Sequence, residues 1–269
     1  MKDARRHFEL VWELAWRDIR LQYRRPYFGF LWMLIIPASL ALMYKFLLSD
    51  LMHVRTGAYP FFIYLLCAMI PWNFFANSLQ RCSRCILDNR NIIHQLAFPK
   101  ALIPVSTVVS NLIQLLPALA VLVLFQLLSG AGISPLAVLL PFVLLLHVFM
   151  VTGIAFFVSA LQVFHRDTEY FLQVVLAGLF FLTPVVYPLD LIVSSGHPLL
   201  IRLYFYNPLV GLTDLYRAAL LPGFPAGLPA QAGIVSTLIV PCVFSVFVLL
   251  AGFRFFRTSE RLFYDHLNR

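Results

Sequence analysis

Cys82 and Cys85 have the spacing of a zinc-binding or redox pair, which makes them the first residues in this sequence that could do chemistry. A zinc site needs two more ligands, and His94 is the only nearby residue that could supply one. Both cysteines also lie in or beside apolar runs, where cysteine usually serves as a small buried residue. We therefore expect no metal site in this chain.

Acidic residues are absent from the middle of every apolar run that could cross a membrane, although the chain has twelve of them. Transporters driven by protons or cations place ionisable groups there. The sequence therefore indicates neither a proton relay nor a cation site. His147 is the only titratable group that we place near such a midpoint, and we interpret it as a hydrogen-bonded packing residue. The chain also lacks the Gly-x-x-x-x-Gly-Lys-Ser/Thr loop that holds ATP phosphates. Active transport would therefore draw its energy from another polypeptide.

The composition is that of a membrane protein. Of the 269 residues, 61% are hydrophobic and 12% are charged, whereas a typical soluble domain has about 25% charged residues. A mean hydropathy of +0.85 cannot be accommodated in a soluble core of this size. We predict an all-α polytopic membrane protein with six transmembrane helices. The expected spans are about 27–48, 59–79, 101–128, 136–163, 170–186 and 232–253.

Residues 1–26 predict an amphipathic helix that lies in the plane of the membrane interface. Apolar residues recur there at spacings of three and four, which is one face of a helix. Trp12 and Trp16 lie on that face, and arginines surround it. This arrangement is typical of helices at the level of the lipid headgroups. A soluble helix packed on a partner protein is the alternative.

A polar internal stretch predicts a short helix over 82–96, lying across the membrane surface. With six spans, this stretch and both termini lie on the same side of the membrane. The other side then keeps only Lys45, Arg55, Arg202 and Arg217 of the twenty basic residues. By the positive-inside rule, this excess of basic residues on the side of the termini places both termini in the cytoplasm. It also accounts for the net charge of +8 without nucleic acid.

Residues 188–228, between the last two spans, contain apolar pieces that are flanked by prolines and too short to cross a bilayer. We interpret them as short re-entrant or interfacial helices. The membrane domain would then cover 27–256, and 257–269 would form a polar cytoplasmic tail.

Five groups of residues together resemble the permease subunits of polysaccharide-exporting ABC transporters, which have the type 2 exporter fold. In chain order they are Arg17-Asp18 with Tyr23, Gly29, Trp32 and Pro37; Phe98-Pro99-Lys100 with 102–106; 164–167; 180–188; and 207–220, which includes Arg217. The matches are in order and cover nearly the whole chain. Cys82 and Cys85 depart from the family pattern, as does His165, where an aromatic residue is common.

The resemblance implies a permease that exports a lipid-linked polysaccharide across the bacterial inner membrane, with O antigen as the predicted substrate. Capsule and teichoic acid remain open. It implies a homodimer of this chain with two copies of a cytoplasmic ATPase subunit, which would bind ATP and magnesium. This chain would hold no cofactor and would not itself be an enzyme. The alternatives are a type 2 exporter of a drug or a lipid, and a membrane enzyme that acts on a lipid-linked sugar.

The resemblance also assigns roles to four groups of residues. The coupling helix that docks on the ATPase would be 82–97, with Asp88, Asn89, Arg90, Asn91, His94 and Gln95. The N-terminal interface helix would contribute Trp12, Trp16, Arg17, Asp18 and Arg20. The first and fifth spans would line the conduit with Tyr27, Phe30, Trp32, Tyr170, Phe181 and Tyr187. The outer gate would be 188–228, with Tyr204, Asn207, Pro208 and Arg217.

Overall fold

The computed structural model is helical in every regular element that it describes. The described residues are 2–22, 31–54, 56, 59–95, 98–128, 132–188, 190–194, 196–224 and 235–263. Five helical segments in these ranges are long and apolar enough to cross a membrane. They are Leu34–Leu51, Phe61–Asp88, Leu102–Leu128, Pro135–Phe164 and Ser236–Leu262. The prediction of an all-α polytopic membrane protein is therefore confirmed.

The fifth expected span, 170–186, corresponds to the shorter apolar helix α7 (Thr168–Leu182). Its 15 residues extend over about 22 Å, less than the ~30 Å of a hydrocarbon core. The helix ends where Thr183 adopts an extended conformation and Pro184 follows. The described chain thus has five full-length candidates and one helix that is too short by itself.

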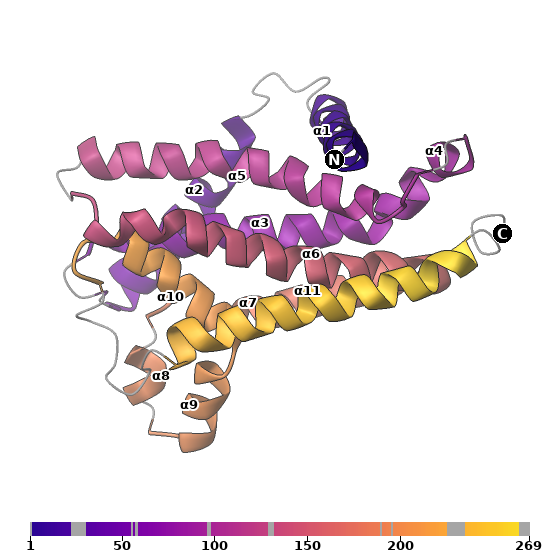
Figure 1. The fold of residues 1–269 in the computed structure, drawn as a ribbon. Helices are drawn as coiled ribbons and strands as arrows, with labels where there is room; N and C mark the ends of the chain where they lie inside the picture. The colour runs from indigo at the N-terminus through magenta and orange to yellow at the C-terminus, as the bar shows by residue number, and fades with distance from the viewer. Residues whose placement is uncertain are drawn as a thin grey trace.

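Helix α3 (Phe61–Asp88) lies at the centre of the bundle, against α5 (Leu102–Leu128) and α6 (Leu140–Phe164), as Figure 1 shows. Most of its side chains are buried, including nearly all of those between Phe61 and Phe75. The first half of α3, which is apolar on all sides and buried, is typical of a core position.

Helix α11 (Val240–Ser259) follows α6 along its length, and two glycines allow the backbones to meet. A Cβ at Gly252 would lie 2.2 Å from the carbonyl oxygen of Gly153, and one at Gly153 would lie 2.6 Å from the backbone of Val248. Small residues permit such close approach between membrane helices. Any larger residue at either glycine would push the two helices apart.

The end of α11 is fastened to the start of α5. After α11, a 3₁₀ turn (Glu260–Leu262) follows, so part of the predicted tail is helical. The backbone N–H of Lys100 donates to Glu260 Oε1 at 3.1 Å, and Lys100 Nζ donates to the Glu260 carbonyl oxygen at 3.4 Å. Burial lowers the pKa of Lys100, while the Glu260 carboxylate opposes that shift. Residues 264–269 of the predicted tail lie outside the described residues.

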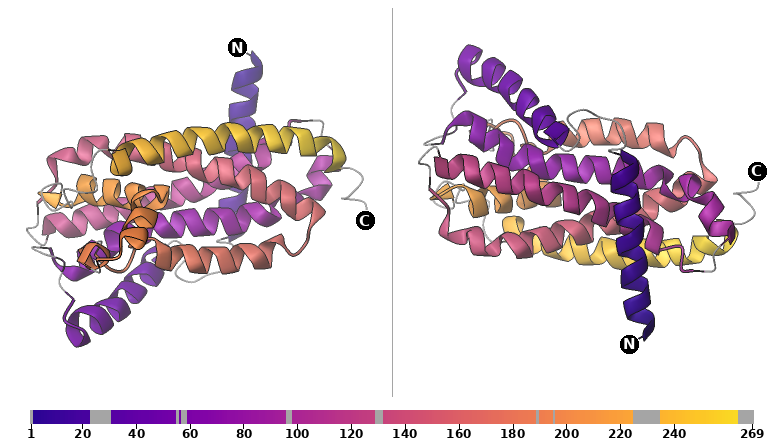
Figure 2. Two further views of the ribbon diagram at one scale, coloured as in Figure 1. Left: turned by 90° about the horizontal axis from the view of Figure 1, so that it is seen from below. Right: turned by 90° about the horizontal axis from the view of Figure 1, so that it is seen from above.

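Helix α2 (Trp32–Tyr44) projects obliquely from the bundle (Figure 2). It continues as π-helical turns over Lys45–Leu51, where Lys45 and Asp50 form an ion pair at 3.3 Å. Most of its large apolar side chains are exposed in the single chain. The first span therefore has an apolar surface that the rest of this chain does not cover.

Helix α1 (Lys2–Gln22) crosses the bundle instead of following it, as the right-hand view of Figure 2 shows. Its buried Ala15 and its contacts with α5 define the side that packs on the bundle. Trp12 and Trp16 are both exposed. The predicted N-terminal helix is present, and its remaining residues 23–26 lie outside the described part of the chain.

The predicted helix over 82–96 is divided in the structure. Residues 82–88 are the last turns of α3, and a separate short helix, α4 (Arg90–Gln95), begins after Asn89. Cys82, Cys85 and Ile86 are buried, and their spacing of three and four continues the buried face of α3. Packing therefore extends α3 nine residues beyond the predicted span.

Three short helices occupy the region predicted to be re-entrant, namely α8 (Asp190–Ser194), α9 (Pro198–Phe205) and α10 (Pro208–Leu220). Asn207 begins α10 as its N-cap and accepts a hydrogen bond from the Leu209 N–H at 3.0 Å. Helix α10 lies toward the end of the bundle opposite α4 (Figure 1). The remaining described turns are Pro135–Leu139 before α6 and Val235–Ile239 before α11.

Candidate functional site

A groove of about 1100 Å³ separates α1 from the segment that contains α4. Its apolar wall includes Trp12, Trp16, Ile92 and Phe98, and Arg20 lies at its edge. The two indole rings meet edge to face, with their centroids 5.8 Å apart. The predicted interface helix and the predicted coupling segment therefore line one groove, which combines exposed aromatic rings with a basic rim.

Arg17 joins α1 to the junction between α3 and α4. Its guanidinium donates hydrogen bonds to the Asn89 side-chain oxygen and, at 3.1 Å, to Asp18. Asn89 in turn donates to the Cys85 carbonyl at the end of α3, at 2.8 Å. Charged donors make the stronger hydrogen bonds, so Arg17 and Asn89 connect α1 firmly to the end of α3.

The other residues predicted for coupling are at the same end of the bundle. Asp88, Arg90 and Asn91 are exposed at or beside α4. Their positions leave them available to a partner on that side. The side chains of His94 and Gln95 are not among those that the structure describes.

Among the residues predicted to line a conduit, Tyr170 and Phe181 share an exposed face of α7. They are 67% and 61% exposed, whereas Leu172 and Leu176 on the other face are buried. Positions eleven residues apart lie on the same side of a helix. Trp32 at the start of α2 is also exposed. Tyr27 and Phe30 lie outside the described residues.

Tyr187 differs from the other predicted conduit residues because its hydroxyl forms hydrogen bonds within the chain. It donates to the Phe181 carbonyl and shares a hydrogen bond of 2.7 Å with the Tyr204 hydroxyl. Burial and the bond with Tyr204 raise the pKa of Tyr187 above its usual range, so the hydroxyl stays protonated. Tyr187 thus helps to hold the end of α7.

Side chains from the predicted gate supply hydrogen-bond donors to the carboxyl end of α7. Asn207 donates to the Leu182 carbonyl at 3.2 Å. The single Tyr204 hydroxyl proton is donated either to the Phe181 carbonyl at 3.2 Å or to the Tyr187 hydroxyl at 2.7 Å. The last carbonyls of a helix have no partner within the helix and need such donors. The predicted gate and the end of the predicted conduit helix are therefore one hydrogen-bonded unit. Pro208 is the first residue of α10, where its missing N–H is harmless.

Arg217, which the sequence assigns to the outer side of the membrane and to the outer gate, has a fully buried side chain. It donates to the Pro184 and Val185 carbonyls, pairs with Asp214 at 3.5 Å, and lies over the Tyr64 ring at 4.0 Å. Those carbonyls follow the end of α7, so Arg217 completes the set of donors there. Asp214, three residues earlier on the same helix, is the one sequence signal that could have indicated a buried pair.

His147 is buried and shares a hydrogen bond of 3.1 Å with the Tyr216 hydroxyl. Its ring also meets the Phe74 ring edge to face, with centroids 4.8 Å apart. The interpretation of His147 as a hydrogen-bonded packing residue is therefore confirmed. Cys82 and Cys85 are buried free thiols. Within the described ranges, no three His, Cys, Asp or Glu side chains gather as a metal site would require.

The architecture defines a helical membrane protein with a groove of aromatic and basic side chains at one end and a buried hydrogen-bonded network toward the other. Residues 9–221 match the family described as ABC-2 type transporter, and the chain belongs to this family.

Curated relatives of this chain include two kinds of permease or transport protein. It is 30% identical over 210 residues to the O-antigen export system permease protein RfbA of Myxococcus xanthus, covering 78% of this chain and 79% of that protein. It is 28% identical over 218 residues to the Klebsiella pneumoniae protein of the same name, covering 80% and 82%. It is 25% identical over 268 residues to the polysialic acid transport protein KpsM of Escherichia coli, covering 96% and 97%.

Proposed function

We propose that this chain is the permease subunit of an ABC transporter that exports a lipid-linked polysaccharide, first of all O antigen, across the bacterial inner membrane. The observation that carries this proposal is membership of the ABC-2 family together with relatives that are named as O-antigen and polysialic acid transport proteins. The matches to these relatives extend over most of both chains, so they concern the whole membrane domain.

The groove between α1 and α4 is the docking surface for a cytoplasmic ATPase subunit. Exposed Trp12 and Trp16 offer apolar contact area, and the exposed Arg20 and Arg90 offer charged contacts. Aromatic residues and arginine are the residues most enriched at protein interfaces. Two copies of this chain and two ATPase subunits form the complex. ATP and magnesium bind to the ATPase, both termini lie in the cytoplasm, and this chain carries no cofactor.

A chain of polar contacts leads from this groove to α7. Arg17 connects α1 to Asn89, and Arg84 near the end of α3 pairs with Glu169 in the first turn of α7 at 3.6 Å. ATP-driven closure of the ATPase pair shifts α4 and α1, and these contacts pass the shift to α7. The exposed faces of α7 and α2 are the walls of the conduit, and 188–228 is its outer gate.

The experiment is deletion of the gene in its own organism, followed by detection of glycan on both sides of the inner membrane. Loss of surface glycan with accumulation of lipid-linked glycan in the cytoplasmic leaflet supports the proposal, provided that the wild-type gene restores export. Surface glycan that is normal while export of a drug or a phospholipid fails would refute it. Loss of the glycan in both compartments would indicate a role in synthesis and would also refute it.

A further inference from the structure

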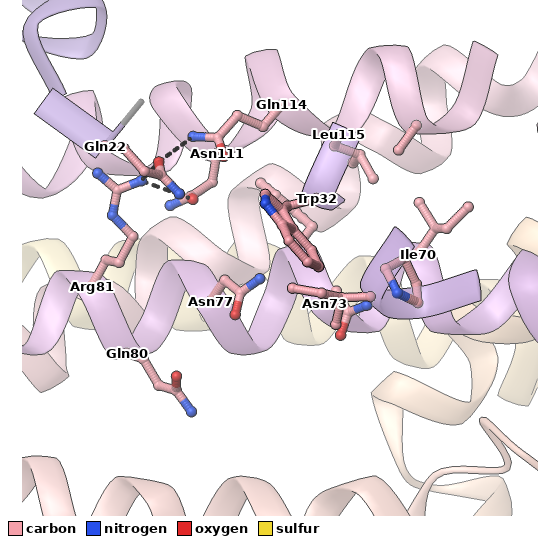
Figure 3. Close-up of a pocket in the computed structure, with 14 residues that line it drawn as sticks. Gln22, Trp32, Ile70, Asn73, Asn77, Gln80, Arg81, Asn111, Gln114 and Leu115 are labelled. Atoms are coloured by element: carbon pink, nitrogen blue, oxygen red, sulfur yellow. Dashed lines mark hydrogen bonds between the residues drawn. The ribbon is translucent and has the colours of Figure 1, made fainter. Parts of the chain in front are cut away.

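A second hollow, separate from the α1–α4 groove, lies inside the bundle beside the end of α1 (Figure 3). It has a volume of about 460 Å³ and is bounded by α2, α3, α5 and Gln22. Its lining combines amides, one arginine and one tryptophan with apolar side chains, among them Ile70, Phe74 and Leu115. Of the residues assigned roles above, Trp32, a predicted conduit residue, lines it, and none of those assigned to coupling or gating does. We refer to it as the amide pocket.

Six of the fourteen lining residues are amides, namely Gln22, Asn73, Asn77, Gln80, Asn111 and Gln114. Asn73, Asn77 and Gln80 are spaced by four and three residues, so α3 presents them on one side. Asn111 and Gln114 lie one turn apart on α5. The sequence thus places amides on two adjacent helices. Figure 3 shows Arg81 reaching from α3 to Asn111 beside Gln22 and Gln114, whereas the Gln80 side chain points away from the α5 amides in that view.

The three α3 amides form no side-chain hydrogen bond with any other residue that the structure describes. Each primary amide offers two N–H donors and a carbonyl acceptor. Asn77 and Gln80 are exposed and Asn73 is half-buried, so these groups are accessible to a ligand, and polar residues inside membrane helices usually serve a function. A ligand that both donates and accepts hydrogen bonds would satisfy them. A hydrocarbon ligand would not.

Arg81 is the one charged side chain in the lining, and its position is fixed by neighbouring amides. Its Nη1 donates to Gln22 Oε1 at 2.8 Å and to Asn111 Oδ1 at 3.3 Å. Gln114 also donates to Gln22 Oε1, at 3.0 Å. The Nε and Nη2 groups of Arg81 keep their donors for a ligand, as far as the described residues show. Since no carboxylate lines the pocket, a phosphate can approach Arg81 without repulsion.

Trp32 lies farther along the pocket from Arg81, next to Asn73 and Leu115 (Figure 3). An indole face is a large apolar surface on which the C–H face of a sugar ring can lie, while the hydroxyl groups reach the amides. Asn73 and Arg81 are eight residues apart on α3, which separates them by about 12 Å along the helix. The pocket is therefore long enough for a phosphate and an attached sugar in sequence.

We propose that the amide pocket binds the sugar that adjoins the phosphate of a lipid-linked glycan, with the phosphate at Arg81 and the sugar between Trp32 and the α3 amides. The identity of the cargo rests on the proposed function, but the site itself rests on the pocket geometry. A phospholipid headgroup shares the phosphate chemistry of this ligand and lacks the sugar ring.

The test uses the full chain in lipid nanodiscs without the ATPase, with Trp32 as its only tryptophan after W12F, W16F and W72F. Three probes are added separately: a prenyl diphosphate disaccharide, the same prenyl diphosphate without sugar, and phosphatidylglycerol. The proposal predicts a saturable shift of Trp32 emission with the disaccharide probe alone. An equal response to the sugar-free prenyl diphosphate or to phosphatidylglycerol, or no response to any probe, would overturn it.

Asn77→Leu in the same background should weaken binding of the disaccharide probe about tenfold, as expected when one or two hydrogen bonds are lost. Thr258→Leu, which replaces an exposed polar side chain on α11 outside the pocket, is the control and should leave the affinity unchanged. Asn73→Leu repeats the test should Asn77→Leu fail to assemble. Unchanged affinity in the folded α3 variant, or equal losses in variant and control, would refute the site.

This outcome is separable from that of the gene deletion. If the chain exports glycan but Trp32 does not respond to the disaccharide probe, the pocket assignment fails and the proposed function stands. If Trp32 responds but the deletion leaves surface glycan intact, the proposed function fails while the pocket remains a sugar site.

Discussion

The two ends of α7 are held by contacts of very different kinds. At its start, Glu169 pairs with Arg84 at 3.6 Å, and the Arg84 side chain is 58% exposed. At its other end, the carbonyls of 181–185 receive donors from Tyr187, Tyr204, Asn207 and the fully buried Arg217. Exposed ion pairs contribute about 0–1 kcal/mol, whereas breaking a buried pair costs about 3–5 kcal/mol.

This difference indicates which end of α7 moves in a transport cycle. The contact at the start can break and form again at little cost, and it lies near the groove that we assign to the ATPase. The contacts at the other end of α7 can break only if several buried hydrogen bonds are lost together. We therefore expect α7 to pivot about its capped end, so that its exposed aromatic face is displaced most near Tyr170.

The largest expected effect comes from removing the buried cation. Arg217→Met takes the ion-pair partner from Asp214 and the donor from the Pro184 and Val185 carbonyls. We expect a loss of about 3–5 kcal/mol in unfolding free energy, measured by thermal unfolding in detergent. Arg202→Met on the exposed face of α9 is the matched control. Equal stability of the two variants would show that the capped end is not fixed as described.

The next effect in size concerns the Tyr187 hydroxyl. Tyr187→Phe keeps the ring and removes the donor to the Phe181 carbonyl and the bond with Tyr204. A cost of about 1–2 kcal/mol in unfolding free energy is expected, together with reduced export. Tyr206→Phe, at a ring that is 70% exposed, should change neither quantity. A loss of export with no change in stability would instead make Tyr187 a wall residue of the conduit.

A smaller effect on stability is expected at the start of α7. Arg84→Glu replaces the ion pair with Glu169 by a repulsion, which should change the unfolding free energy by no more than about 1 kcal/mol. ATP-driven export should fall nonetheless, because the contact that passes movement to α7 is lost. The double variant R84E/E169R should regain export. A double variant as defective as the single one would argue against transmission through this pair.

The smallest effect on stability is expected for the exposed face of α7. Phe181→Ala removes a ring that is 61% exposed, so the unfolding free energy should stay within about 0.5 kcal/mol of the wild type. Export should fall if this face lines the conduit. Phe247→Ala, at an equally exposed ring on α11, should leave export intact. Equal behaviour of the two variants in the export assay would mean that Phe181 faces lipid.

The sequence predicted those parts of the fold that depend on local pattern. Hydropathy located the long apolar helices, and spacings of three and four located α1. The sequence pattern predicted one helix over 82–96 and missed the division at Asn89. Polar residues surround Cys82, Cys85 and Ile86, so the pattern did not show that these three residues continue the buried face of α3. That α3 continues to Asp88 is known only from the packing of the neighbouring helices against this face.

The hydrogen-bonded cap of α7 could not be predicted in the same way. Arg217 finds its partners 32 and 33 residues earlier in the chain, and the Tyr64 ring lies still farther away in sequence. Apart from Asp214, three residues earlier on the same helix, nothing in the local pattern distinguishes such an arginine from one that faces water. The amide pocket is an intermediate case. The spacing of Asn73, Asn77 and Gln80 is readable, but the facing amides on α5 are known only from the packing.

The most direct test of the account is ATP-dependent glycan uptake into inverted vesicles that contain this chain and its ATPase subunit. The wild type and Arg261→Glu, which alters an exposed arginine at the same end of the bundle, should take up lipid-linked glycan when ATP is supplied. Arg90→Glu at the start of α4 should abolish uptake and ATPase binding while the chain stays folded. Uptake by Arg90→Glu at the wild-type rate, or uptake that needs no ATPase, would contradict the account.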